Sequence, residues 1–140
     1  MIPGRLTEPA YIPFAEAGPP RPSGKAYKIK GRTYRLLDTG AGYEEIGEAT
    51  WYGPGFHRRT TANGERYNMN ALTATHTSLP MNTVVEVTNL VNGQKVIVRI
   101  NDRGPFARGR IIDLSRKAAE KIDLDGKAQV KVKALGTAKL

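Results

Sequence analysis

The sequence predicts a small, mainly β domain whose short strands close into a barrel. Three observations support this prediction. Apolar and polar residues alternate in several short segments, turn-forming pairs separate these segments, and only one stretch has a helical period. Short strands leave unpaired edges, and closing a sheet on itself removes them.

The N-terminal part is predicted to be an extended arm followed by a hairpin. Residues 1–24 form the arm, because its six prolines disfavour a helix and any central strand. Proline-rich segments act as stiff spacers, so we expect the arm to join the domain to something else. Residues 25–46 are a hairpin extension, with strands around Gly31 between Lys25 and Leu37 and a break at Gly40–Gly42.

Residues 47–136 are predicted to be the barrel, with a tail at 137–140. Its first half contains strands at 47–52, 71–76, 83–89 and 95–101. Asn92-Gly93 lies between the last two and is the strongest hairpin motif, because this pair tolerates the positive φ angles of a type I′ turn. In the second half, Ile111-Ile112 is a buried strand end. Ser115 caps a helix at 116–122, and a last strand follows at 128–135.

Composition limits the classes of function. The absence of cysteine excludes disulfides, thiolate nucleophiles and cysteine-based zinc sites. With only two histidines we predict no metal site and no cofactor. A net charge of +9 favours polyanionic partners, although scattered Lys and Arg also simply solvate a surface. Aromatics are few and no recognition motif for nucleic acid is present, so nucleic acid is not a predicted partner. No signal peptide or apolar membrane span is visible, and membrane contact would need an anchor not present in this chain.

Several motifs together resemble the rare lipoprotein A family over about residues 25–135. The motifs are Gly47–His57, which contains Trp51-Tyr52-Gly53-Pro54-Gly55-Phe56, then Thr61–Glu65, Ala71–Ala74, Asn101–Phe106 and Arg110–Ser115. The resemblance implies a six-stranded double-psi β-barrel with one or two short helices, similar to expansins, barwin proteins and some endoglucanases. It also implies a bacterial cell-envelope protein that acts on peptidoglycan.

Enzymes of that family are lytic transglycosylases, which implies endolytic cleavage of MurNAc–GlcNAc bonds to leave 1,6-anhydro-MurNAc ends. The implied substrate is glycan stripped of its stem peptides. The implied location is the periplasm, with an outer-membrane lipoprotein anchor in a longer form left open, and a monomer is favoured. A non-catalytic peptidoglycan-binding or divisome scaffold module of the same fold is the alternative.

Transglycosylation can use one carboxyl group twice, first as an acid and then as a base towards the 6-hydroxyl of the sugar. Asp102 is the first candidate, since it follows an apolar strand and matches the family's catalytic aspartate. Its alternative is a turn brace paired with Arg103. The resemblance also implies catalytic roles for Glu65 and His76. Their alternatives are a solvated turn residue and a satisfied histidine at a strand end.

Substrate binding is predicted for a second group of residues. Asp113 lies near the sugar groove of related barrels, although it also precedes a helix N-terminus. Removal of the stem peptide exposes a lactyl carboxylate that an arginine can hold. Arg103 and then Arg66 are the favoured arginines among Arg59, Arg66, Arg99, Arg103 and Arg110. The aromatic platforms are Trp51, Tyr52 and Phe106, Asn101 completes the predicted set, and His57 is substrate-lining at best.

Overall fold

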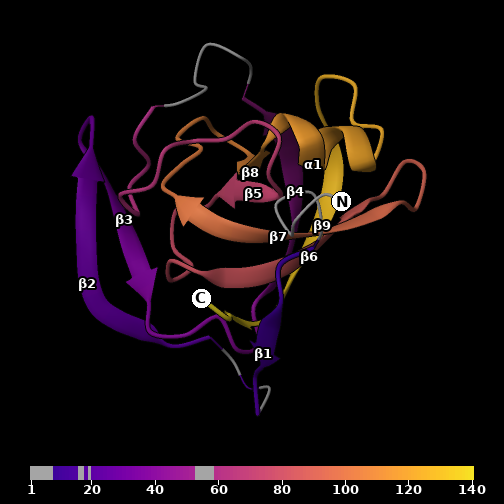
Figure 1. Ribbon diagram of the computed structural model, residues 1–140. Coiled ribbons are helices and arrows are strands. Elements are labelled where there is room, and N and C mark those ends of the chain that lie inside the picture. The colour runs from indigo at the N-terminus through magenta and orange to yellow at the C-terminus, as the bar shows by residue number, and fades with distance from the viewer. Residues whose placement is uncertain (1–7, 16–17, 19, 53–58) are drawn as a thin grey trace.

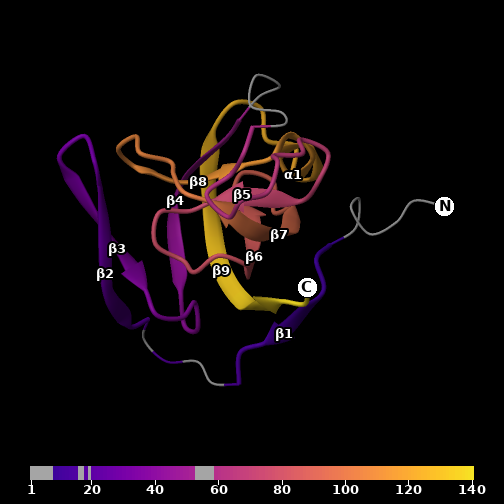
Figure 2. The same cartoon turned by 60° about the vertical axis from the view of Figure 1, so that its left-hand side comes forward.

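The computed structural model describes residues 8–15, 18, 20–52 and 59–140, and in this part of the chain six strands close into a barrel (Figures 1 and 2). The strands are β4 (Glu44–Trp51), β5 (Thr73–Thr75), β6 (Thr83–Asn89), β7 (Lys95–Asp102), β8 (Arg110–Leu114) and β9 (Ala128–Ala138). Their order is β9-β4-β8-β5-β7-β6, and β6 pairs with β9 to close the ring.

Two parallel pairs set the barrel's topology. β4 lies parallel to β8, and β5 lies parallel to β7, whereas the other neighbours are antiparallel. Parallel partners cannot be joined by a tight hairpin, so the chain crosses the barrel between them. The prediction of a mainly β, six-stranded double-psi barrel is confirmed.

The apolar faces of the strands fill the barrel. In β7, Val96, Val98 and Ile100 are buried, while Arg99 between them is only partly buried. In β9, Val130 and Val132 alternate with lysines in the same way. This period of two is what the sequence pattern predicted, and it fixes which residues of each strand face outwards.

The β6–β7 hairpin forms at the predicted place, but its turn differs from the predicted type I′. That turn needs positive φ at both central residues, and of the Asn92-Gly93 pair only Gly93 has it, with φ 78°. The Asn92 side chain instead donates to the carbonyl of Ile122 at 3.0 Å and accepts from the amide of Gln94 at 2.9 Å. These contacts favour a connection between β6 and β7 that is longer than a two-residue turn. They also attach this connection to Ile122, at the end of the helix that follows β8.

A short helix, α1 (Arg116–Lys121), covers the barrel beside β4, β7 and β8 (Figure 1). Ser115 is its N-cap as predicted, because its hydroxyl accepts from the amide of Ala118 at 3.2 Å. Ala118 and Ala119 form its buried face. No helix in the described ranges has the length and apolarity needed to cross a bilayer.

The N-terminal region contributes a hairpin and an edge strand. β2 (Pro22–Ile29) and β3 (Arg32–Leu37) pair as a separate two-stranded sheet that stands beside the barrel (Figures 1 and 2). β1 (Tyr11–Pro13) lies antiparallel to the end of β9. The prolines allowed this, since an edge strand tolerates a missing amide donor. Part of the predicted arm therefore docks on the barrel.

β4 begins at Glu44, before the predicted start at Gly47. Residues 44–46 are exposed, so they lack the alternation that marks a strand, yet they pair with residues 131–133 of β9. At Gly47 itself, a Cβ atom would lie 2.6 Å from the Ile111 side chain of β8. The close approach of the two strands explains the glycine.

The docking of β1 depends on Gly136. This residue pairs with Pro13, and a Cβ there would lie 2.1 Å from the carbonyl oxygen of Ile12. We expect Gly136→Ala to detach β1 while the barrel stays closed. Limited proteolysis before residue 22 should become faster in this variant, whereas Thr137→Ala, at an exposed neighbour, should leave it unchanged. Equal proteolysis of Gly136→Ala and the parent protein would contradict the pairing.

Candidate active site

The register of four neighbouring strands brings two carboxylates to one end of the barrel. On β5, Thr75 pairs with Asp102 of β7 on one side and with Asp113 of β8 on the other. Asp113 in turn pairs with Thr50 of β4. The row is therefore Thr50, Asp113, Thr75, Asp102. At one strand spacing of about 4.8 Å per step, the Cα atoms of the two aspartates lie roughly 10 Å apart.

A pocket of about 330 Å³ opens over this row. Asp102, Asp113 and Thr75 line it together with aromatic, cationic and small residues. The other lining residues are Tyr52, Arg59, Thr60, Tyr67, Arg103, Gly104, Pro105, Phe106 and Arg110. The pocket thus combines two acids, three arginines and three aromatic rings.

Backbone groups hold Asp102 in place. Its Oδ1 accepts from the amides of Ala62 and Arg103, each at 2.8 Å. Its carbonyl oxygen accepts from the amide of His76 at 3.0 Å. For Oδ2 no hydrogen bond is found within the described ranges. The geometry fixes one carboxylate oxygen and leaves the other for a ligand.

Asp113 lies on the other side of Thr75 from Asp102. It forms an ion pair and a hydrogen bond. Its Oδ1 accepts from Arg110 Nη2 at 2.9 Å and from the hydroxyl of Thr50. Only 17% of its side chain is exposed. The ion pair with Arg110 therefore fixes the position of the Asp113 carboxylate at the pocket.

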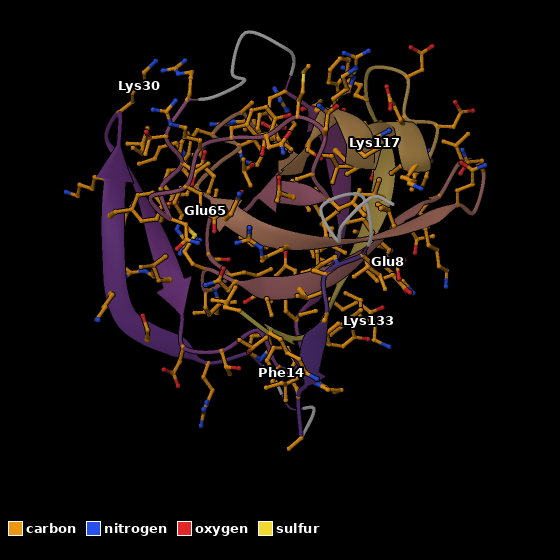
Figure 3. All side chains as sticks on the ribbon, in the orientation of Figure 1. Glu8, Phe14, Lys30, Glu65, Lys117 and Lys133 are labelled. Carbon is orange, nitrogen blue, oxygen red and sulfur yellow. The ribbon has the colours of Figure 1, made fainter. Side chains whose placement is uncertain are left out.

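Glu65 clamps a loop rather than lining the pocket. Its two carboxylate oxygens each accept from Arg99 of β7 at 2.7 Å, and Asn101 and Asn63 donate at 3.1 and 3.0 Å. The Arg99 ion pair lowers the pKa of Glu65 despite its partial burial, with the two amides adding to the effect. Figure 3 shows Glu65 on the side of the barrel that faces the hairpin. Glu65 is therefore held in its ionised form. The loop that it clamps also contains Ala62, whose amide donates to Asp102.

His76 acts on the pocket through the backbone. Its Nδ1 accepts from the amides of Ser78 and Leu79 at 3.0 and 3.1 Å, so Nε2 carries the proton and donates to the hydroxyl of Tyr43 at 2.8 Å. The Tyr43 hydroxyl in turn donates to Glu45. The carbonyls of His76 and Leu79 accept from Arg103 Nη1 at 3.1 and 2.6 Å. The turn that His76 organises thus positions both Asp102 and Arg103.

The buried His76 predicts an acid-sensitive fold. Burial lowers its pKa from 6.5 to about 3, with the Arg103 charge adding to the effect. A histidine with a lowered folded pKa contributes stability above its unfolded pKa and loses it as pH falls. The free energy of unfolding should therefore drop by roughly 2–3 kcal/mol between pH 6.5 and 4.5, before most carboxylates titrate.

Chemical denaturation at several pH values measures this slope. In His76→Asn, whose amide can still accept from the turn, the slope in this window should disappear. His57→Gln, at the other histidine of the sequence, should keep it. A parent protein equally stable at pH 6.5 and 4.5 would show that His76 does not titrate as described.

The three predicted aromatic platforms do not lie together, because Tyr52 and Phe106 line the pocket and Trp51 does not. Tyr52 and Tyr67 line the pocket with ring centroids 4.3 Å apart. Burial raises the pKa of Tyr52, and the charges of Tyr67, Asp102 and Asp113 raise it further, so its phenol stays protonated near both acids. Trp51 instead lines a different hollow beside α1, with Arg116, Ala119, Glu120 and Leu124.

The structure brings together some of the predicted site residues. Asp102, Asp113, Arg103, Tyr52 and Phe106 share the pocket, and so do Arg59 and Arg110. The predicted residues outside its lining are Glu65, His76, Trp51, Arg66 and Asn101, together with Arg99. Of these, Glu65, Asn101 and Arg99 form the clamp, and Arg66 is exposed. His57 and residues 53–56 of the first motif lie outside the described residues.

Sequence reasoning missed Thr75 and Tyr67. The Thr75 hydroxyl is buried and has no partner among the described residues, as is also true of Arg110 Nε. Both groups belong to residues that line the pocket. Nothing in the local sequence marks Thr75, because its importance comes from pairing with two distant strands. No group of three or more His, Asp or Glu side chains in the described ranges could hold a metal ion.

A closed barrel with two parallel pairs of strands, and with a pocket lined by two aspartates and three arginines at one end, defines a double-psi β-barrel protein. Residues 44–134 match the family model DPBB_1, described as lytic transglycolase. The chain belongs to this family.

Relatives named endolytic peptidoglycan transglycosylase RlpA are similar over most of the chain. The protein from Campylobacter jejuni is 54% identical over 114 residues, which cover 80% of this chain and 42% of that protein. The protein from Vibrio cholerae is 44% identical, covering 91% of this chain and 47% of the relative. The chain therefore spans less than half the length of these relatives. Among solved structures, the Streptomyces papain inhibitor has a TM-score of 0.53 at 24% identity, covering 69% of this chain and 98% of the inhibitor. That likeness concerns the fold alone.

Proposed function

We propose that this chain is the catalytic domain of an endolytic peptidoglycan lytic transglycosylase. The observation that carries the proposal is the pairing of Thr75 with both Asp102 and Asp113, which gathers two carboxylates in one pocket of a lytic transglycolase domain. The names of the relatives support peptidoglycan as the substrate and the bacterial cell envelope as the location. A periplasmic site with an outer-membrane lipid anchor in a longer chain is part of the proposal.

In the proposed reaction Asp102 serves as both acid and base. Its Oδ2 gives a proton to the glycosidic oxygen as the bond from that oxygen to C1 of MurNAc breaks. The 6-hydroxyl oxygen of the same MurNAc then bonds to C1, and its proton returns to Asp102. No water is consumed, and the closure is intramolecular. The negative charge of Asp113 stabilises the positive charge that develops at the sugar ring.

The residues around Asp102 have supporting roles. Tyr52 lines the pocket with a phenol that stays protonated near both acids, and Thr75 and Arg110 line the pocket with it. Glu65 and His76 position Asp102 through the 61–65 loop and the 76–79 turn.

Denuded glycan is the proposed substrate class. Each MurNAc without a stem peptide carries a lactyl carboxylate, and Arg59, Arg103 and Arg110 make the pocket rim cationic. Arg103 remains the arginine favoured for binding the lactyl carboxylate, because it lines the pocket and two carbonyls fix its Nη1. Amidated, peptide-bearing MurNAc offers no such charge.

Incubation with purified denuded glycan, followed by mass analysis, tests the proposal. New 1,6-anhydro-MurNAc ends are expected. Reducing ends would instead identify a hydrolase, and binding without products would identify the non-catalytic module.

A further inference from the structure

The hairpin β2–β3 carries an aromatic pair against the pocket rim. Tyr27 and Tyr34 lie directly opposite each other in the two strands, with ring centroids 5.5 Å apart and planes at 22°. Phe106 meets both rings edge-on, at 5.2 Å from Tyr34 and 6.4 Å from Tyr27. Because Phe106 also lines the pocket, these three rings form one continuous surface with it, which we call the hairpin wall.

The hairpin wall is attached to the part of the barrel that positions the acids. The Tyr27 hydroxyl donates to the carbonyl of Thr77 at 2.8 Å, and the amide of Leu37 donates to that of Ser78 at 2.9 Å. Both acceptors belong to the turn that follows His76. Figures 1 and 2 show the hairpin standing alongside the barrel, and Figure 1 shows β7 ending on the side that faces it.

The rings of the hairpin wall are only partly covered. Tyr27 and Tyr34 are half-buried, and Phe106 is 38% exposed. Aromatic rings that pack on each other but stay accessible at a pocket rim resemble the lining of ligand sites rather than a core.

The hairpin also has a uniform charge. Between Pro22 and Leu37 the sequence contains five Lys or Arg residues and no Asp or Glu. Arg32 lies over the Tyr34 ring at 5.6 Å from its centroid. The hairpin therefore combines aromatic stacking surfaces with positive charge. These two properties are complementary to a glycan chain whose sugars carry regularly spaced carboxylates.

We propose that the hairpin wall is a second binding site for anionic glycan, which holds the sugar units of a denuded strand that extend beyond the pocket. The hairpin precedes residues 44–134, so it lies outside the part of the chain that the family model matches. This proposal rests on the proposed function. It predicts that affinity rises with strand length because long strands reach Tyr34 and short oligosaccharides do not.

Binding of length-graded denuded strands to the full chain tests the proposal. Tyr34→Ala should weaken binding of long strands about tenfold and leave binding of an oligosaccharide that fills only the pocket unchanged. Tyr34→Phe, which keeps the ring, should bind long strands like the parent. Arg35→Ala is the matched control, since Arg35 is exposed on the opposite face of the same strand and contributes one of the five positive charges of the hairpin.

Three outcomes would overturn the second site. They are unchanged long-strand binding by Tyr34→Ala, equal losses for short and long strands, and an equal loss in Arg35→Ala, which would indicate general attraction of polyanions. A matching tenfold loss for a single-stranded oligonucleotide would point to nucleic acid instead. Melting temperature confirms that each variant is folded. If the parent binds strands with the expected length dependence but forms no anhydro ends, the proposed function fails while the second site stands.

Discussion

Asp102→Asn is expected to reduce release of anhydro products by about 100-fold or more, with the fold and glycan binding retained. Removal of a positioned general acid costs about that much. The amide is nearly isosteric, and its oxygen can still accept from the amides of Ala62 and Arg103. It cannot deliver a proton to the glycosidic oxygen. Product release measured by mass and binding measured separately distinguish the two effects.

Asp125→Asn provides the control for Asp102→Asn. Asp125 is exposed between α1 and β9 and does not line the pocket, so its loss removes the same charge from another part of the surface. This variant should retain full activity. Near-normal anhydro release by Asp102→Asn would remove Asp102 from the mechanism.

The second large effect is expected at the ion pair of Glu65 and Arg99. Glu65→Gln breaks a bidentate contact that clamps the 61–65 loop to β7, and this loop presents Ala62 to Asp102. A small displacement of a catalytic group can cost about 100-fold in rate, so a loss approaching that size is expected. Arg99→Gln should give a similar loss, and the double variant should be little worse than either single one.

A double-mutant cycle in turnover tests this coupling. The matched control is the exposed pair of Arg116 and Glu120, whose removal should change activity little. Losses that simply add for Glu65 and Arg99 would mean that the two residues act independently. Full activity in Glu65→Gln would show that the clamp has no part in positioning Asp102.

The barrel itself was largely predictable, because its strands have a simple period. The alternation of valines in β7 and β9 and the cap at Ser115 are local patterns, and each placed its element close to where it lies. The edge strand β1 was not predictable, since three proline-flanked residues carry no period. Its pairing depends on Gly136, more than a hundred residues away in the chain.

The candidate site was predictable in its residue types but not in its grouping. Asp102, Asp113 and Arg103 stand in recognisable motifs, and the pocket contains them. Thr75 belongs with them only because β5 lies between β7 and β8 in the closed barrel. Glu65 and His76 carry reactive side chains, yet their contacts are to Arg99 and to the 76–79 turn. The family motifs indicated that Glu65 and His76 belong to the site. Only their contacts in the folded chain indicate that they position Asp102.

The central claim is that the sugar closes on its own 6-hydroxyl with Asp102 as acid and base. Digestion of denuded glycan in water enriched in heavy oxygen tests this most directly, with Asp102→Asn run alongside. We predict new ends that are one water lighter than reducing ends and carry no heavy oxygen, with almost none formed by the variant. Heavy oxygen at the new ends would show that water attacks the sugar and would contradict the transglycosylase account.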